Sequence, residues 1–198
     1  MSPPPVSSPT DQQLVERVLR GDPAAFGHIV RRTEGLVAQL VFKMIRHPAD
    51  RPDLAQEVYL KAYKNLAGFK FQAKLSTWIG QIAYNTCLHY LEKKQLVLLD
   101  DLCPEEANAP ADHAAPPAPD TPESLFVDQQ RTAILHAEID RLPPLFRTLV
   151  ALYHQQELSY AEIAQITALP EGTIKSYLFR ARRTLQQQVL ARYYRDDL

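Results

Sequence analysis

The stretch LSYAEIAQITALPEGTIKSYLFRARRTL, residues 158–185, contains two helical patterns separated by a short break. Ser159 followed by Glu162 forms a capping-box pattern, which predicts the start of the first helix. The chain breaks at TALP, and Pro170 is typical of the first turn of a second helix. A short helix, a tight break and a longer helix together predict a helix-turn-helix.

The second of these helices carries an apolar stripe beside basic ones. Its apolar side chains recur at helical spacing and predict a buried face: Ile174, Leu178, Ala181 and Leu185. The neighbouring stripes hold cationic, hydroxyl and aromatic side chains: Lys175, Ser176, Phe179, Arg180, Arg182 and Arg183. A helix that lies in a DNA groove needs this order, and backbone N–H groups near Gly172 and Thr173 suit a phosphate. An amphipathic surface helix with basic decoration has the same pattern, so both interpretations stay open.

The net charge of −1 hides an uneven distribution along the chain. Residues 1–95 hold 13 Lys and Arg against 8 Asp and Glu, and residues 125–198 hold 9 against 8. Residues 96–124 hold seven acidic residues and no Lys or Arg. The two flanking segments are therefore positive, which suits a polyanionic partner despite the near-neutral total.

The acidic segment 96–124 also contains six of the 16 prolines. Proline and acid at this density predict an extended, flexible linker rather than a helix or sheet. The linker divides the chain into an N-terminal lobe, about 10–95, and a C-terminal lobe, about 125–195. Residues 1–9, rich in serine and proline, are predicted to be a disordered tail.

The N-terminal lobe shows helical periodicity throughout. Helices are expected over about 11–20, 22–45, 52–68 and 76–94, with Thr10 or Asp11 as the first N-cap and Gly21 as a stop. No strand-like alternation of useful length occurs in the chain. The predicted fold class is all-α, with two small helical domains joined by a Pro/Ala/acid-rich linker and a helix-turn-helix in the second.

Several classes of function lack their sequence signals. Cys87 and Cys103 have neither disulfide nor metal-ligand spacing, which suits a reducing cytosol. No apolar run approaches 18 residues, and the N-terminus does not have the pattern of a secretory signal. No phosphate-binding glycine loop, nucleophile elbow or paired carboxylate site occurs. We therefore expect a cytoplasmic protein that is not an enzyme and has no metal or cofactor.

Two polar features of the N-terminal lobe suit binding. Asp53, Gln56, Glu57 and Lys61 share one side of a predicted helix, which fits either a protein interface or a solvated face. The loop 69–75 interleaves two phenylalanines with two lysines. Stacking and phosphate attraction of this kind are what unpaired bases need, although core aromatics beside solvated lysines give the same pattern.

Residues 142–185 resemble the promoter −35-binding domain of bacterial extracytoplasmic-function (ECF) sigma factors. The match is nearly unbroken in LSYAEIA and GTIKSYLFRARRTL. Tyr153 stands where relatives often have Arg, and Glu157 where they often have Gly. Arg182 or Arg183 would reach phosphate or the polymerase surface. The resemblance implies that the −35 element is bound by Thr173, Lys175, Ser176, Phe179, Arg180 and Arg183.

The N-terminal lobe resembles the polymerase-clamp and −10-binding domain of the same family, in DQQLVERVLRGDPAAF, DLAQEVYLKAYKNL and STWIGQIAYNT. The resemblance implies that Asp53, Gln56 and Glu57 dock the β′ coiled coil of core polymerase. It also implies a pocket for a flipped −10 base, with Phe71 where relatives often have Gly. The implied −10 residues are Phe69, Lys70, Phe71, Lys74, Leu75, Trp78 and Asn85.

The two matches cover about 10–95 and 125–190 and follow the order of sigma regions 2 and 4. They imply a sigma factor that binds core RNA polymerase, including its β flap, and directs initiation at −10 and −35 promoter elements. Many members are held inactive by an anti-sigma factor, which makes such a protein a candidate partner. The linker then either threads through polymerase or is plainly disordered. A conventional helix-turn-helix regulator and a module that binds an acidic protein are the alternatives.

Overall fold

The computed structural model describes residues 9–100 and 123–193. The predicted tail, apart from residue 9, and residues 101–122 of the predicted linker lie outside these ranges. Every regular element of the described residues is a helix, which confirms the predicted class: α1 (Asp11–Leu19), α2 (Pro23–Met44), η1 (Pro48–Asp50), α3 (Arg51–Asn65), η2 (Leu66–Gly68), α4 (Leu75–Asp100), α5 (Glu123–Arg141), α6 (Pro144–His154), α7 (Tyr160–Thr167) and α8 (Glu171–Tyr193).

Local signals set the first two helix starts. Thr10, rather than Asp11, caps α1 and forms a capping box with Gln13. Gly21 ends this segment with a φ of 92°, a conformation that glycine adopts without steric cost. Asp22 then caps α2 by accepting hydrogen bonds from the first backbone N–H groups of that helix.

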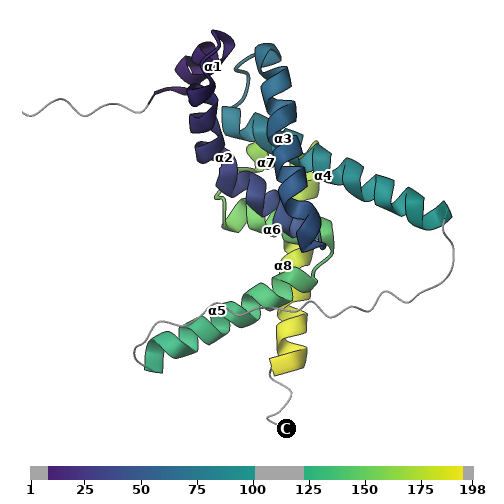
Figure 1. Cartoon of the computed structure of the whole chain (residues 1–198). Coiled ribbons are helices and arrows are strands. Elements are labelled where there is room, and N and C mark those ends of the chain that lie inside the picture. The colour runs from purple at the N-terminus through teal and green to yellow at the C-terminus, as the bar shows by residue number, and fades with distance from the viewer. Residues whose placement is uncertain (1–8, 101–122, 194–198) are drawn as a thin grey trace, which may run out of the picture.

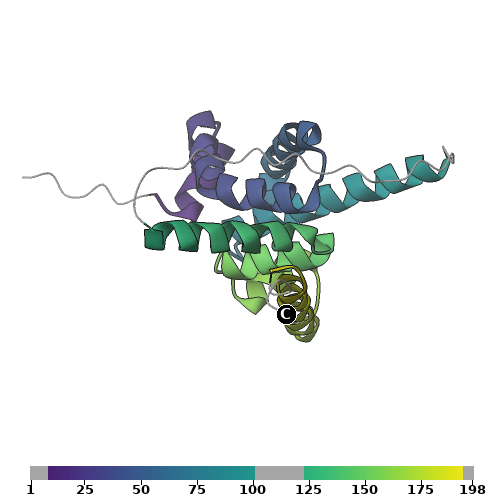
Figure 2. The ribbon, with the colours of Figure 1, turned by 90° about the horizontal axis from the view of Figure 1, so that it is seen from below.

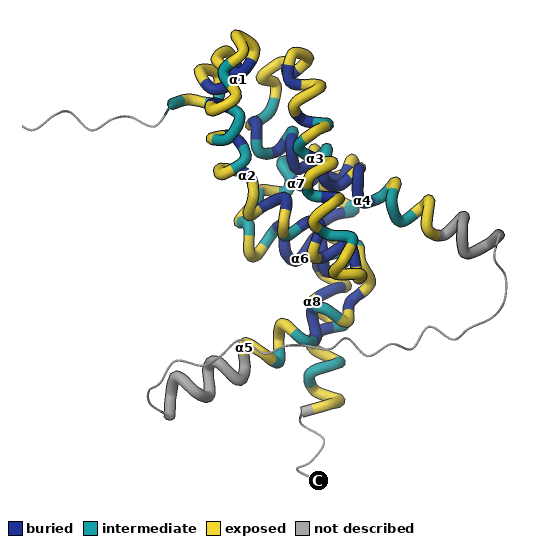
Figure 3. The backbone as a smooth tube through the Cα atoms, viewed as in Figure 1, coloured by how far each residue is buried: buried dark blue, intermediate teal, exposed yellow. Residues whose placement is uncertain are grey.

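The N-terminal lobe, α1 to α4, forms one core around α2 and α4. α1 packs on α2, and α3 packs on both α2 and α4 (Figure 1). Apolar side chains from all four helices are fully buried in it, among them Leu14, Ile29, Leu40, Val58 and Ile79. The exposed sides of these helices face outward around that core (Figure 3).

The C-terminal lobe, α5 to α8, packs α8 against α5, α6 and α7. Its fully buried side chains include Leu142, Leu149, Ile163, Ile166 and Ile174. Ser159 and Glu162 form the predicted capping box at the start of α7. α7 ends at Ala168 in the left-handed conformation, with a φ of 57°, and this turn separates it from α8.

Two helices extend into the segment expected to be linker. α4 continues to Asp100, because its last turns contain no proline, and the first proline of the segment is Pro104. α5 begins at Glu123, directly after Pro122, a residue common just before or within the first helical turn. The C-terminal lobe is expected to be helical, but the sequence predicts only the two helices of the helix-turn-helix in it, so α5 and α6 have no individual counterpart.

The two lobes lie against each other as two layers, with α4 on α7 and α2 on α6 (Figure 2). Lys43 and Asp140 form an ion pair of 2.6 Å between them, and the Arg147 guanidinium donates to the Lys43 carbonyl. Gly80 lets the lobes approach closely, because a Cβ atom there would lie 3.1 Å from Ile166 Cδ1. The end of α4 and the start of α5 extend away from this contact (Figure 1).

Candidate nucleic-acid interface

The apolar stripe of α8 fixes which side of that helix faces out. Ile174, Leu178, Ala181 and Leu185 are all buried against the C-terminal lobe, as the spacing predicts. Phe179 is 65% exposed, which is unusual for a large aromatic side chain and costs free energy unless a partner covers it. The basic stripes are therefore displayed on the outer surface.

The predicted −35 residues lie together on this outer side. Lys175, Ser176, Arg180 and Arg183 are exposed, and Thr173 is half-buried in the first turn. The Lys175 ammonium lies 5.2 Å from the Tyr160 ring centre. Arg182 is also held by an aromatic ring, 5.8 Å from the centre of Tyr153. Ser176 donates to the Gly172 carbonyl within the helix.

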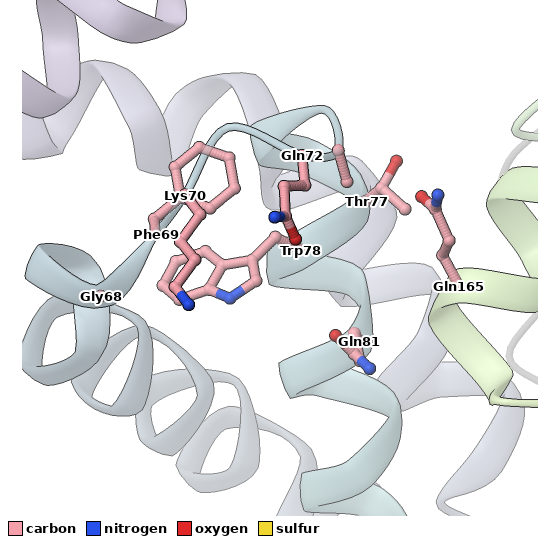
Figure 4. A pocket seen from close by; sticks show the side chains of 9 residues that line it. Gly68, Phe69, Lys70, Gln72, Thr77, Trp78, Gln81 and Gln165 are labelled. Carbon is pink, nitrogen blue, oxygen red and sulfur yellow. The ribbon is translucent and has the colours of Figure 1, made fainter.

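A second site lies where η2 leads into α4. A cavity of about 360 Å³ opens there, with an aromatic side formed by Phe69 and Trp78, whose ring centres are 5.1 Å apart (Figure 4). Phe71 packs on Phe69 at 4.7 Å. The remaining lining is mostly polar and comprises Gly68, Lys70, Gln72, Ala73, Thr77, Gln81 and Gln165.

The residues predicted to bind the −10 element differ in burial and in whether they line the cavity. Phe69, Lys70 and Trp78 line the cavity, and Phe71 is 48% exposed beside it. Phe69 and Leu75 are buried, so they support the loop from the core of the lobe. Lys74 and Asn85 are exposed.

Asn85 lies on the same face of α4 as Trp78, two turns further along the helix. The seven residues are thus neighbours, but they do not all line one cavity.

Four polar side chains of the cavity were missed by the sequence analysis: Gln72, Thr77, Gln81 and Gln165. The helical spacing of Trp78 and Gln81 is the signal that would have identified Gln81. Gln165 comes from α7 of the other lobe, and only the packing of the lobes places it here. No local pattern reveals such a residue.

The predicted polymerase-binding face of α3 contains an apolar element. Asp53, Gln56 and Glu57 are exposed, and Glu57 pairs with Lys61 at 2.7 Å. Leu60 follows on the same side and is 54% exposed. A single exposed leucine is common on protein surfaces, so this face fits either a protein interface or a solvated surface.

Phe71 and Glu157, where the resemblance leads us to expect glycine, have a common backbone conformation. Phe71 has a φ of 57° and Glu157 a φ of 52°, both in the left-handed region. Glycine adopts this region at little cost, whereas other residues are strained in it. A glycine at either position would adopt this conformation at less cost.

Glu162 and Cys87 have strongly shifted pKa values. Lys74 and the Ser159 N–H and hydroxyl groups lower the pKa of Glu162 to about 2. Burial raises the pKa of the Cys87 thiol to about 12, so it is not a reactive nucleophile. Among the described residues no three His, Cys, Asp or Glu side chains group as metal ligands. None of the helices described is both long and apolar enough to cross a bilayer.

The protein has a helix-turn-helix lobe with an exposed basic helix, packed on a helical lobe with an aromatic cavity. These features define a two-lobed class of nucleic-acid-binding proteins. Comparison with known proteins identifies a family within this class. Residues 29–97 match the family model of sigma-70 region 2, and residues 132–185 match that of sigma-70 region 4.

The ECF RNA polymerase sigma-E factor of Escherichia coli is 36% identical over 181 residues, covering 91% of this chain and 94% of the relative. The RNA polymerase sigma-H factor of Pseudomonas aeruginosa is 34% identical over 179 residues, covering 89% and 92%. The chain belongs to the ECF sigma factors of the sigma-70 family.

A solved structure shares the fold. The sigma factor RpoE of Bartonella quintana, in complex with the anti-sigma factor NepR, aligns with a TM-score of 0.62 and 21% identity. The alignment covers 82% of this chain and 94% of that one. The arrangement of helices is therefore one already seen among sigma factors.

Proposed function

We propose that this chain is the promoter-specificity subunit of RNA polymerase, binding core enzyme and directing initiation at −10 and −35 elements. Residues 10–95 would act as region 2 and residues 125–195 as region 4, with a tail over 1–9 and a linker over 96–124. The proposal rests on one observation. The same ECF sigma factor has an exposed basic helix and an aromatic cavity that Lys70 also lines.

At the −35 element, α8 would enter the major groove of duplex DNA. Arg180 is exposed, and its planar guanidinium suits bidentate hydrogen bonding to a guanine edge. Lys175, Ser176 and Arg183 would contact base edges or phosphate, and Phe179 would cover the thymine methyl or sugar surface. Thr173, in the first turn, would place its N–H near a phosphate at the helix N-terminus.

At the −10 element, the cavity beside Trp78 would accept an unpaired base of the non-template strand. Flipping a base costs a few kcal/mol of unstacking, and stacking on Phe71 or Trp78, with Phe69 packed against both rings, would offset part of that cost. Lys70 and Lys74 would attract the backbone on either side. Asn85 would meet the strand further along α4, while Leu75 would hold the loop from inside.

The face of α3 with Asp53, Gln56, Glu57 and Leu60 would bind the β′ coiled coil, and the C-terminal lobe would bind the β flap. A protein with these partners works in the cytoplasm and performs no chemistry of its own. An anti-sigma factor is a further candidate partner, because the Bartonella quintana structure contains one.

Run-off transcription with core polymerase tests the proposal. The chain and core together should give specific transcripts from a genomic promoter library, whereas each alone should give none. Tight operator binding by the chain without polymerase, and no specific transcripts with it, would favour a conventional helix-turn-helix regulator instead.

Variants of α8 in the same assay test its assignment. Arg180→Ala should reduce −35-dependent transcription about tenfold or more, because a good base contact contributes roughly 1–3 kcal/mol. Arg182→Ala, which removes the same charge from a guanidinium held over Tyr153, is the matched control and should reduce it less. An equal loss of core binding in the Arg180 variant would contradict its assignment to DNA.

A further inference from the structure

Two tyrosines lie stacked where α6 meets α7, beside α8. Tyr153 is in the last turn of α6, and Tyr160 is the first residue of α7. Their ring centres are 5.0 Å apart, and the ring planes differ by 11°. The turn between them reverses the chain through Glu157, in the left-handed conformation, and a hydrogen bond of 3.1 Å from the Leu158 N–H to the Leu152 carbonyl. The turn therefore fixes the two rings as one unit, the tyrosine stack.

α8 places one cation against each ring of the tyrosine stack. The Lys175 ammonium lies 5.2 Å from the centre of the Tyr160 ring, and the Arg182 guanidinium carbon lies 5.8 Å from the centre of the Tyr153 ring. The two cations are seven residues apart in one helix, which separates them by about two turns, or about 10 Å. They are thus placed to meet two anionic groups rather than one.

The rings hold these cations without neutralising them. Within the described part of the chain, neither Lys175 nor Arg182 forms an ion pair with a carboxylate. A carboxylate would fix a cation and also compensate its charge, whereas an aromatic ring leaves the charge available to another anion. The Arg182 charge acts on its surroundings: the pKa of His154 is lowered, first by burial and then by this charge.

The angular positions along α8 separate these two cations from the residues that face straight out. At about 100° per residue, Lys175 and Arg182 lie on one edge of the exposed side, next to the buried stripe. Ser176, Phe179 and Arg183 lie at its centre. A helix in the major groove directs its centre toward base edges and its sides toward the phosphates of the groove walls. The edge with the tyrosine stack therefore suits phosphate contacts.

We propose that the tyrosine stack positions Lys175 and Arg182 as two phosphate contacts on one wall of the major groove at the −35 element. The inference rests on the proposed −35 function of α8 and names the residues that fix its backbone contacts. Tyr153 stands where the resemblance leads us to expect arginine. The guanidinium of such an arginine is absent here, and the Tyr153 ring holds the guanidinium of Arg182 instead. Tyr153 is thus a positioning residue that acts through its ring.

Binding of a −35 duplex by core polymerase combined with the full chain tests the role of the ring. The probe is a fluorescent duplex that carries the −35 element of a promoter found by run-off transcription and ends before its −10 element. In anisotropy titrations, Tyr153→Leu should weaken binding about two- to fivefold, the effect of one cation–π contact. Tyr153→Phe keeps the ring and should bind like the unsubstituted chain. An equal loss with Tyr153→Phe would overturn the role of the ring.

A double-mutant cycle shows whether Tyr153 acts through Arg182. Arg182→Ala should weaken binding about two- to fivefold and reduce the slope of log K against log salt concentration by about one, as the loss of one phosphate contact does. Tyr153→Leu should then cause little further loss in the Arg182→Ala protein. Additive losses would show that Tyr153 supports the fold of the lobe and not Arg182, and would overturn the proposal. Tyr160→Leu and Lys175→Ala form the same cycle for the other ring.

A second duplex with scrambled −35 bases distinguishes this proposal from the −35 function on which it rests. Phosphate contacts do not depend on sequence, so Tyr153→Leu should weaken binding to both duplexes alike and leave the ratio of their affinities unchanged. Arg180→Ala should lower that ratio. A lower ratio with Tyr153→Leu would overturn the phosphate assignment and leave the −35 function intact. No preference of the unsubstituted protein for the promoter duplex would overturn the −35 function itself, and this proposal with it.

Discussion

Three single residues of this chain have a left-handed backbone conformation, which is energetically costly for residues other than glycine. Phe71, Glu157 and Ala168 all have φ between 52° and 57°, and none is glycine. Each follows from a turn that the fold requires: the loop into α4, the turn before α7 and the break inside the helix-turn-helix. The strain is tolerated because the flanking helices are held by their own packing.

Ala168→Gly should therefore stabilise the protein. Glycine at the C-terminal end of α7 removes the steric cost of the left-handed conformation, and we expect the free energy of unfolding to rise by up to about 1 kcal/mol. The matched control is Ala161→Gly on the exposed side of the same helix, which should lower stability. Urea denaturation of both variants measures the two changes. A loss of stability in both would show that the turn at Ala168 is not strained.

The hydroxyl groups of two buried threonines allow a similar comparison. Thr77→Val removes an unpartnered hydroxyl and should leave the stability of the free protein unchanged or raise it by about 1 kcal/mol. Thr33→Val removes a hydroxyl that donates to the Ile29 carbonyl and lies 3.2 Å from the Tyr59 hydroxyl, and should lower stability by about 1 kcal/mol. Thermal unfolding distinguishes them. Equal destabilisation would mean that Thr77 has a partner in solution.

At the scale of secondary elements, the start of α7 depends on a charged side chain. Its capping box uses Glu162, whose pKa is lowered to about 2 from its usual 4.5, first by Lys74 and then by Ser159. A lowered carboxyl pKa means that the folded state favours the ionised form. The stabilisation is fully present above about pH 4.5 and is lost as the pH falls toward 2.

Acid titration of stability tests this charge dependence. The difference in unfolding free energy between the unsubstituted chain and Glu162→Gln should be constant near neutral pH and should shrink between about pH 4.5 and 2. Denaturant unfolding over this pH range measures the difference. A difference that does not change with pH would show that Glu162 acts through packing alone.

The elements themselves could largely be predicted from the sequence, because their signals are local. The capping box at Ser159, the stop at Gly21 and the apolar stripe of α8 each depend on residues within a few positions. The start of α5 is not predicted, because Glu123 directly follows a proline-rich segment whose composition is typical of a linker. α4 continues to Asp100 because the first proline of segment 96–124 is Pro104, which lies after the end of the helix. The average composition of that segment does not reveal this.

The candidate site could be predicted only in part, for a different reason. The stripes of α8 and the aromatics of the loop at 69–75 follow from spacing and residue type. The placement of Gln165 in the cavity and of Glu162 on Lys74 depends on contacts between residues about 90 positions apart. Such contacts arise from the packing of whole lobes, which no local pattern encodes.

On the scale of the whole molecule, the contact between lobes combines apolar packing with buried charge. Lys43 is 5% exposed and Arg147 is 6% exposed, and both lie between the lobes. Arg147 donates across the contact to the Lys43 carbonyl near the end of α2, and also to the Asp140 carbonyl at 3.0 Å. Asp140 in turn pairs with the Lys43 ammonium. Removing Arg147 leaves the Lys43 and Asp140 carbonyl groups without its donors, while the Lys43–Asp140 ion pair remains.

Arg147→Met should therefore both destabilise the protein and loosen the lobes. Methionine keeps most of the apolar volume but leaves two carbonyl groups without donors, and we expect a loss of about 1–3 kcal/mol in unfolding free energy. The exposed Arg31→Met is the control for the loss of an arginine elsewhere and should change stability little. Small-angle scattering should show a larger radius of gyration for the Arg147 variant alone. An unchanged radius together with lowered stability would place the effect of Arg147 within the C-terminal lobe, through Asp140, and not between the lobes.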